Sequence, residues 1–337
     1  MMAYFGADVP LITNNIHYTL TNPISDIFLN VKYNLTNKYM KQSDTYSYMK
    51  EIDNINNISL YENPYNVGFG FLIRNDSELI NMNNDLSNGK TYNSYVELQN
   101  DFSNKLVGED LYELIEFETD PEKIQNDPHV SYVMSDYSNY EEGNPNAYVT
   151  TVIAIGDELK GEFYLDFGIL THLASKDSDK QEPIYIQFQA DQYDSYAGSS
   201  FYLAKLNEDT LQKIHDKLSD SVLYNIYDED DDINATIDAS GDGLIYVSLP
   251  YKDAFTVKVD GKEVKTQSLF KGIGIPVTAG THQICISYRI AGLDISIWVS
   301  IAFLLFFIGF TICTTIYKKR KLNKADEDTS ENISDIN

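Results

Sequence analysis

Residues 295–317 read ISIWVSIAFLLFFIGFTICTTIY, and the basic run KKRK follows at residues 318–321. A run of about 23 uncharged residues is long enough to cross the ~30 Å hydrocarbon core of a bilayer as a helix. Trp298 near its start and Tyr317 at its end suit the two membrane–water interfaces. The sequence therefore predicts one transmembrane helix, from Ile295 to Tyr317.

The alternative for this stretch is the buried core helix of a soluble protein. Soluble helices of this length carry a polar face, and the hydroxyl-bearing residues here are too few to form one: Ser296, Ser300, Thr311, Thr314 and Thr315. Basic side chains that flank a membrane helix stay on the cytoplasmic side, and here they are Lys318, Lys319, Arg320 and Lys321. We therefore expect residues 318–337 to form a cytoplasmic tail and residues 1–294 to lie outside.

The start of the chain does not explain how residues 1–294 would be exported. Residues 1–20 have neither a basic n-region nor a continuous apolar h-region, so no signal peptide is readable. We expect the required membrane helices to come from a missing N-terminal portion before Met1 or from a companion protein. The reversed orientation is the alternative, and it places the basic run outside, against the charge rule.

The charge of the chain limits its partners. Its 337 residues include 25 basic and 51 acidic side chains, for a formal net charge of −26. The tail after Tyr317 holds five of each sign, so the preceding region carries all of this charge. Such a surface repels nucleic acid and anionic lipid headgroups, so no nucleic-acid partner is expected. It tolerates cationic partners, although its simplest role is to keep the region soluble.

The sequence before the membrane helix predicts a mainly β fold with some α. We expect an extracytoplasmic α+β subdomain over residues 1–120 and a β-sandwich of the jelly-roll or immunoglobulin-like kind over residues 121–294. Short strands at regular spacing are predicted at residues 130–134, 147–155, 162–170, 184–190, 201–206, 233–237, 244–249, 255–259, 262–266, 272–277 and 281–289. Asp260-Gly261 between two alternating runs predicts a hairpin.

Helical periodicity is confined to a few segments before residue 295. Residues 24–30 follow a turn and read as a short helix. Residues 91–108 predict an amphipathic helix that Asn93 caps and Gly108 ends, and Asn207 caps another helix with apolar residues up to Val222. In the apolar strand at residues 67–73, two glycines indicate a bulge or a close backbone approach.

Chemical motifs are scarce. The five histidines show no paired ligand spacing, and no zinc, P-loop or nucleophile-elbow motif is present. The best metal candidates are Asp228, Asp230 and Asp232, whose alternate oxygen ligands resemble the start of a calcium loop, although the glycine expected at position six is missing. A solvated acidic loop is the alternative, and no other cofactor and no catalytic residue are expected.

Several stretches, in order along the chain, resemble the YfhO family of bacterial polytopic membrane proteins. Near the C-terminus they are residues 244–251 (LIYVSLPY), 255–264 (FTVKVDGKEV), 274–283 (GIPVTAGTHQ) and 286–289 (ISYR), followed by the membrane helix. Earlier ones are residues 26–33 (DIFLNVKY), 63–70 (NPYNVGFG), 98–102 (LQNDF) and 106–108 (LVG). At residues 254–255 the chain has Ala-Phe where the family tends to have a tryptophan.

The resemblance implies a role in the cell envelope of a bacterium. YfhO proteins are thought to be GT-C-type glycosyltransferases that use a polyprenyl-phosphate sugar at the outer membrane face and act on lipoteichoic acid and related polymers. Their catalytic acid is expected in an outer loop near the first membrane helices. No residue of this chain matches it, so the resemblance implies that this chain alone is not catalytic.

A second hypothesis is a single-pass surface protein. In this view the β-sandwich binds an envelope glycan or a protein partner, and the bilayer serves only as an anchor.

Overall fold

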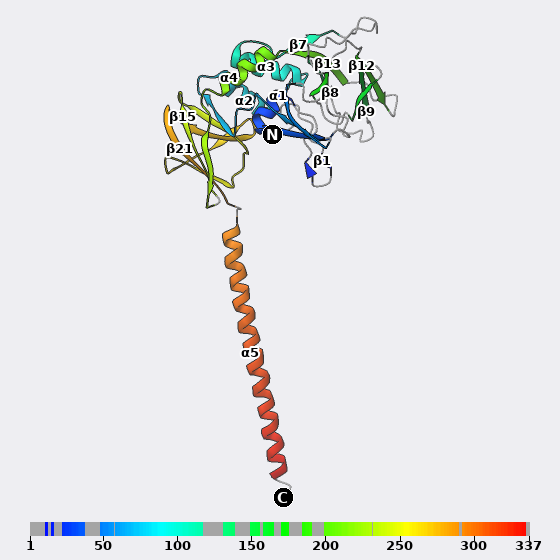
Figure 1. The fold of residues 1–337 in the computed structure, drawn as a ribbon. Helices are drawn as coiled ribbons and strands as arrows, with labels where there is room; N and C mark the ends of the chain where they lie inside the picture. The colour runs from blue at the N-terminus through cyan, green and yellow to red at the C-terminus, as the bar shows by residue number, and fades with distance from the viewer. Residues whose placement is uncertain are drawn as a thin grey trace. The chain divides into compact units, whose positions relative to one another are not determined.

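The computed structural model describes residues 11–12, 15–16, 22–37, 48–56, 58–116, 131–138, 149–155, 158–164, 170–174, 184–190, 199–230, 232–289 and 292–334. These residues form mostly β-sheet with some helix, as predicted (Figure 1), and one of the five helices, at residues 78–87, was not predicted. The chain divides into two units, one of Met1–Asp253 with Val257–Ile286 and one of Ala254–Thr256 with Ser287–Asn337.

Six sheets are present among the described residues. One contains, in order, β14 (Tyr224–Glu229), β15 (Asp232–Ala239), β21 (Gly280–Tyr288), β17 (Phe255–Val259) and β18 (Lys262–Val264). A second contains β19 (Gln267–Leu269), β20 (Gly272–Val277), β16 (Gly243–Pro250) and β6 (Gly70–Arg74), and a third β11 (Leu170–Ala174), β8 (Tyr132–Ser138), β13 (Ser199–Leu206) and β7 (Tyr112–Ile115). A fourth sheet contains β10 (Glu158–Tyr164), β9 (Val149–Ile155) and β12 (Ile184–Ala190). A fifth contains β3 (Tyr33–Asn37), β5 (Ile58–Glu62) and β4 (Lys50–Ile55), and the sixth pairs β1 (Leu11–Ile12) with β2 (Asn15–Ile16).

The helices are α1 (Pro23–Leu29), α2 (Glu78–Ser87), α3 (Tyr95–Val107), α4 (Glu208–Leu218) and α5 (Leu293–Ser334). Asn207 caps α4 as predicted, because its side chain accepts a hydrogen bond from the Thr210 amide. The predicted cap of α3 is wrong. Ser94, not Asn93, accepts from the Glu97 amide at 3.0 Å, since Ser94 and Glu97 have the spacing of a capping box.

Some predicted bounds also differ from the structure. The strand predicted at residues 162–170 is two strands, β10 and β11, and residues between them lie outside the described part. Helix α4 ends at Leu218, and Val222 forms a β-bridge with Phe71 instead of extending the helix. Residue 130, where one strand was predicted to begin, is not described. The β-sandwich arrangement stays a prediction.

Strand β6 lies beside β16 although more than 150 residues separate them, and the two are antiparallel with Leu72 opposite Ile245. This sheet therefore joins strands from both sides of residue 120, where a domain boundary was predicted, and that boundary stays a prediction. Gly70 confirms the expected close approach. A Cβ at this position would lie 2.6 Å from the Tyr246 carbonyl oxygen.

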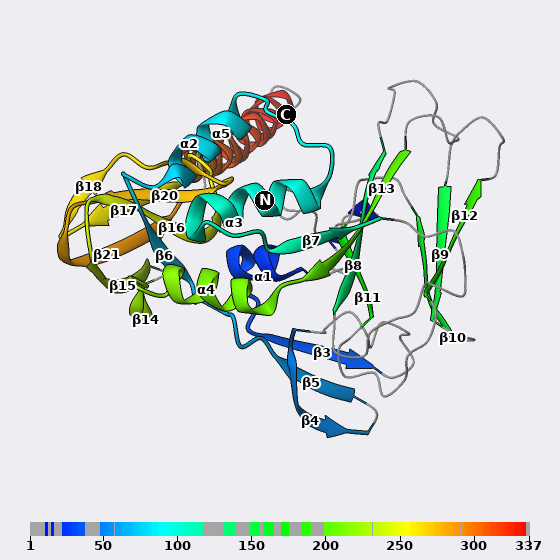
Figure 2. The ribbon, with the colours of Figure 1, turned by 90° about the horizontal axis from the view of Figure 1, so that it is seen from above.

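The core of the first unit is built around an aromatic cluster centred on Phe28 of α1. The Phe28 ring makes edge-to-face contacts with four other rings, at centroid distances of 4.8 to 5.6 Å: Phe71, Phe102, Tyr246 and Phe270. The Tyr246 hydroxyl donates to the Phe28 carbonyl oxygen at 2.7 Å. Figure 2 shows α1 among α3, α4 and the strands, in keeping with this central place.

Truncation of Phe28 should destabilise the fold more than any single surface change. Phe28→Ala removes a fully buried ring from four ring contacts, so we expect a loss of about 3–5 kcal/mol of unfolding free energy. Denaturant titration of the full chain in detergent, followed by tyrosine near-UV dichroism, measures this loss. Tyr227→Ala is the matched control, because Tyr227 is an exposed aromatic residue, and its loss should stay within about 0.5 kcal/mol.

An ion pair ties the turn between β17 and β18 to the start of β21. Asp260 (φ 52°) and Gly261 (φ 76°) form the predicted two-residue hairpin between β17 and β18. The Asp260 carboxylate lies 2.7 Å from His282 Nδ1 and accepts from the Gln283 amide at 2.9 Å. The hydrogen bond to Asp260 raises the pKa of His282 above 6.5. The hydrogen bonds from Gln283 and His282 lower the pKa of Asp260.

The pair makes stability depend on pH in a defined direction. Because the pKa of His282 is higher in the folded state, its contribution is complete below about 6.5 and is lost as pH rises through the folded pKa. Denaturant midpoints should therefore fall from about pH 6 to about pH 9. Asp260→Asn keeps a side chain that tolerates positive φ and should flatten this change. An equal fall in Asp260→Asn would contradict the assignment.

Candidate functional site

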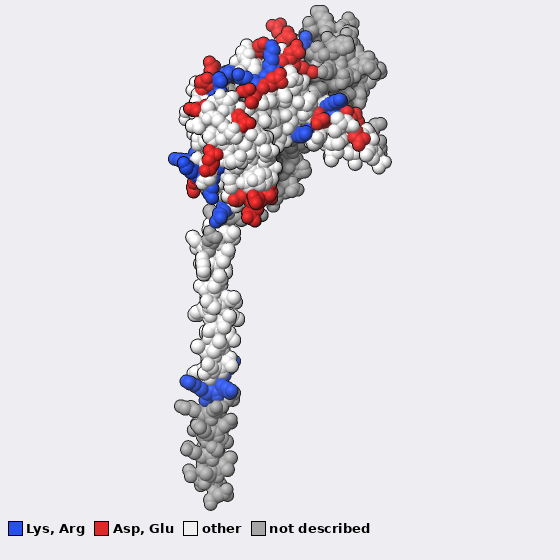
Figure 3. All heavy atoms as spheres, turned by 60° about the vertical axis from the view of Figure 1, so that its left-hand side comes forward, with Lys and Arg blue, Asp and Glu red and all other residues white. Residues whose placement is uncertain are grey.

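Helix α5 contains the one segment of the described residues that is long and apolar enough to cross a membrane, Ile295–Lys321. Its side chains are exposed along the segment, including Ile295, Trp298 and Tyr317. Figure 3 shows this stretch without charged side chains up to a group of blue ones. That group is Lys318, Lys319, Arg320 and Lys321, which follow Tyr317 without a break in the helix.

The hydroxyl groups within this segment bond to the helix itself. Ser300 Oγ donates to the Ser296 carbonyl at 2.7 Å, and Thr311 Oγ1 donates to the Phe307 carbonyl at 2.8 Å. The other three do the same within one turn: Ser296, Thr314 and Thr315. Since lipid offers no hydrogen-bond partner, this internal pairing lets all five hydroxyls lie in a bilayer.

The predicted calcium residues lie on one hairpin. Asp228 is in β14, Asp232 begins β15, and Asp230 has φ 54° in the turn between them. The register pairs Glu229 with Asp232, so this acidic run is the turn of a hairpin. No group of three or more His, Cys, Asp or Glu among the described residues is placed to hold a metal ion. Residue 231 lies outside those residues, and calcium binding here stays a prediction.

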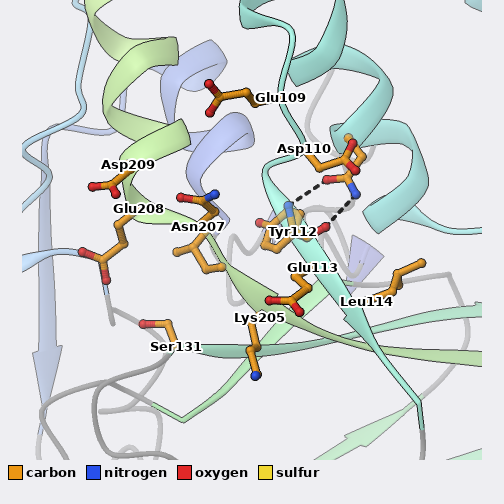
Figure 4. A pocket seen from close by; sticks show the side chains of 12 residues that line it. Glu109, Asp110, Tyr112, Glu113, Leu114, Ser131, Lys205, Asn207, Glu208 and Asp209 are labelled. Carbon is orange, nitrogen blue, oxygen red and sulfur yellow. Dashed lines mark hydrogen bonds between the residues drawn. The ribbon is translucent and has the colours of Figure 1, made fainter.

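A polar pocket of about 870 Å³ lies where β7, the end of β13 and the start of α4 meet (Figure 4). The chain segments around it are joined by backbone hydrogen bonds. The Leu206 amide donates to the Ser131 carbonyl at 2.8 Å, and the Asn207 amide donates to the Leu111 carbonyl at 2.8 Å. These bonds fix the point at which β13 turns into α4.

Asn100 of α3 holds one wall of the pocket. Its amide nitrogen donates to the Tyr112 carbonyl, and its amide oxygen accepts from the Tyr112 amide, both at 2.8 Å (Figure 4). The side chain thus takes the place of a neighbouring strand at the start of β7. Tyr112 itself is buried, which raises the pKa of its hydroxyl, and the charge of Asp26 raises it further.

Carboxylates dominate the lining. There are five of them against one ammonium group: Glu109, Asp110, Glu113, Glu208 and Asp209 against Lys205. Glu109 is paired with Lys213 at 2.5 Å and accepts from Thr210 Oγ1 at 3.2 Å, and the hydrogen bond from Lys213 lowers its pKa. In Figure 4, Glu208 and Asp209 extend from the first turn of α4. The negative charge disfavours phosphates and other anions here and favours hydroxyl-rich or cationic groups.

No sequence motif indicates this pocket. Its residues come from α3, the loop before β7, β7 itself, the residue before β8, the end of β13 and the start of α4, and no two of these segments share a spacing motif. Asn207 was predicted as a helix cap, and that was the one sequence signal close to the site.

Comparison with known proteins identifies the family to which the chain belongs. No curated protein and no solved structure matches the chain. The model of the family described as bacterial membrane protein YfhO matches residues 5–300, which is most of the chain and includes the beginning of α5. The chain therefore belongs to the YfhO family of bacterial membrane proteins.

Proposed function

We propose that this chain is an extracytoplasmic part of a YfhO-type membrane protein that takes part in glycosylation of envelope polymers, of the lipoteichoic acid kind, from a polyprenyl-phosphate sugar. The observation that carries the proposal is the family match over residues 5–300, together with a helix suited to span a bilayer. The family match supports a role at the membrane. The transfer of a sugar is the part that we propose in addition.

Charge supports the proposed sidedness. The basic run at residues 318–321 follows the apolar segment of α5 directly, and basic residues flanking a span are retained in the cytoplasm. Residues 1–294, with their large excess of carboxylates, would then face the exterior.

We assign the transfer step to other membrane segments. The pocket between β7, β13 and α4 is acidic, so it is unsuited to the phosphate of a polyprenyl-phosphate donor. Membrane helices of a further portion or of a companion protein would hold the donor and the catalytic acid. The described region would present or support the acceptor.

Labelling with a membrane-impermeant maleimide tests the sidedness. In a background without Cys285 and Cys313, Glu229→Cys should react in intact cells, because Glu229 is an exposed residue of β14. Asp328→Cys, beyond the basic run, should react only after the membrane is opened.

A charge variant provides the matched control. Replacing Lys318, Lys319, Arg320 and Lys321 by glutamine should increase the labelling of Asp328→Cys in intact cells, since the orientation signal is gone. Labelling of Asp328→Cys but not Glu229→Cys in intact cells carrying the native basic run would reverse the proposed orientation.

The glycosylation role is tested in the host bacterium. Deletion of the coding sequence should remove a sugar substituent from purified envelope polymer, as measured by NMR, and re-expression of the full protein should restore it. An unchanged polymer, with the protein still reaching the exterior, would favour the single-pass binding protein instead.

A further inference from the structure

Two aromatic rings lie just before the apolar segment of α5 in the sequence. Phe255, the first residue of β17, packs against Tyr288, the last residue of β21, with 5.0 Å between the ring centroids. The two strands are neighbours in their sheet, and the Arg289 amide donates to the Ala254 carbonyl oxygen at 2.9 Å. Because this bond holds the ends of both strands together, the backbone fixes the position of the ring pair.

The apolar face of β21 continues past the point at which burial ends. Alternate residues of a strand share a face, and along this face Ile284 is 1% exposed, Ile286 2% exposed and Tyr288 52% exposed. Phe255 is half-buried beside Tyr288. The last position of the apolar stripe therefore carries an amphipathic ring that is open to its surroundings. Tyrosine is common where an apolar surface meets water or lipid headgroups.

Carboxylates are absent from the sequence that leads to α5. Residues 264–293 contain no Asp or Glu, although these make up 51 of the 337 residues of the chain. The same stretch holds three cationic side chains: Lys265, Lys271 and Arg289. Anionic headgroups repel a carboxylate and attract a cation. The next carboxylate, Asp294, lies in the first turn of α5, where the helix dipole stabilises a negative charge. The charge pattern therefore turns basic just before the membrane segment.

The ring pair and α5 belong to the same unit, which contains Ala254–Thr256 and Ser287–Asn337. The Ser296 amide donates to the Gly292 carbonyl oxygen, so the first helical turn includes Gly292. An extended chain spans at most about 3.5 Å per residue and a helix about 1.5 Å. Tyr288 therefore lies within about 19 Å of Ile295, where the apolar segment begins. Because the headgroup region adjoins the hydrocarbon core, the lipid surface is within reach of the rings.

The residue types at this place suit the membrane interface. Tyrosine is enriched at the headgroup level, where its ring lies in the apolar boundary and its hydroxyl stays wet. Arg289 is exposed beside Tyr288, and an arginine at this level can extend its guanidinium toward lipid phosphates. A protein partner could also use tyrosine and arginine. The bilayer is favoured because a spanning α5 keeps these residues at a high effective concentration near lipid.

We propose that Phe255 and Tyr288, with Arg289 beside them, lie at the headgroup level of the bilayer that α5 crosses and form a second aromatic anchor. Trp298 of α5 and the ring pair then mark two depths of one interface, with Trp298 the deeper. The anchor holds the ends of β17 and β21 at the lipid surface. It does not depend on which side of the membrane this end of α5 faces.

Fluorescence quenching tests the anchor on the full chain in vesicles of phosphatidylcholine with acyl chains brominated near the headgroup. Trp298, the one tryptophan of the sequence, is the positive control and should be quenched. In a Trp298→Phe background, quenching of Tyr288→Trp should exceed that of Thr281→Trp by about threefold or more. Thr281 is the matched control, because it is an exposed residue of the same strand and lies about 23 Å farther from α5 along β21.

Phe255→Trp repeats the measurement on the neighbouring strand, in case Tyr288→Trp fails to fold as judged by circular dichroism. Quenching of Trp298 together with equal quenching of Tyr288→Trp and Thr281→Trp overturns the anchor and leaves the membrane role of α5 intact. A blue-shifted Tyr288→Trp emission without bromine quenching also overturns it, because protein would then cover the ring. Neither the sidedness nor the glycosylation role enters this measurement, so its outcome is independent of theirs.

Discussion

The contacts of the Phe28 ring are the constraint on which the first unit depends. Its edge contacts reach Phe71, Phe102, Tyr246 and Phe270, so the centre of the core cannot form until segments from both ends of the chain are in place. The pairing of β6 with β16 has the same requirement. Contacts this distant in sequence make folding slow and cooperative. They also explain why α1, a helix of seven residues, is stable: its position is set by packing, with Asn22 as its cap.

Asparagine side chains provide the second recurring interaction. Three asparagine side chains each donate to a backbone carbonyl and accept from a backbone amide. Asn63 donates to Val31 and accepts from Tyr65, and Asn83 donates to Ser268 and accepts from Phe270. Asn100 makes both bonds to Tyr112. A primary amide has the same donor and acceptor pair as a peptide group, so these residues pair with backbone that no strand reaches. The abundance of asparagine in the sequence therefore has a structural explanation in addition to turn formation.

The sequence predicts those features that depend on neighbouring residues. The apolar segment of α5, the Asn207 cap and the Asp260-Gly261 hairpin are all determined locally, and the structure confirms them. The close approach at Gly70 is also confirmed, but its partner Tyr246 is distant in sequence and could not be named in advance. Helix α2 escaped prediction because its asparagine-rich sequence has low helix propensity, and packing of Leu79 and Met82 into the core stabilises it. The pocket could not be predicted, since Asn100, Tyr112 and Asn207 meet only through tertiary contacts.

The place of β21 within its sheet has a mechanical consequence. This strand, the last before α5, lies between β15 and β17 rather than at an edge. Just beyond it the Arg289 amide donates to the Ala254 carbonyl at 2.9 Å, and the Tyr288 ring lies against Phe255. A pulling force on α5 would therefore act first on a strand that is hydrogen-bonded on both sides, and not on an edge strand. Detachment of this strand would require both of its hydrogen-bonded ladders to open.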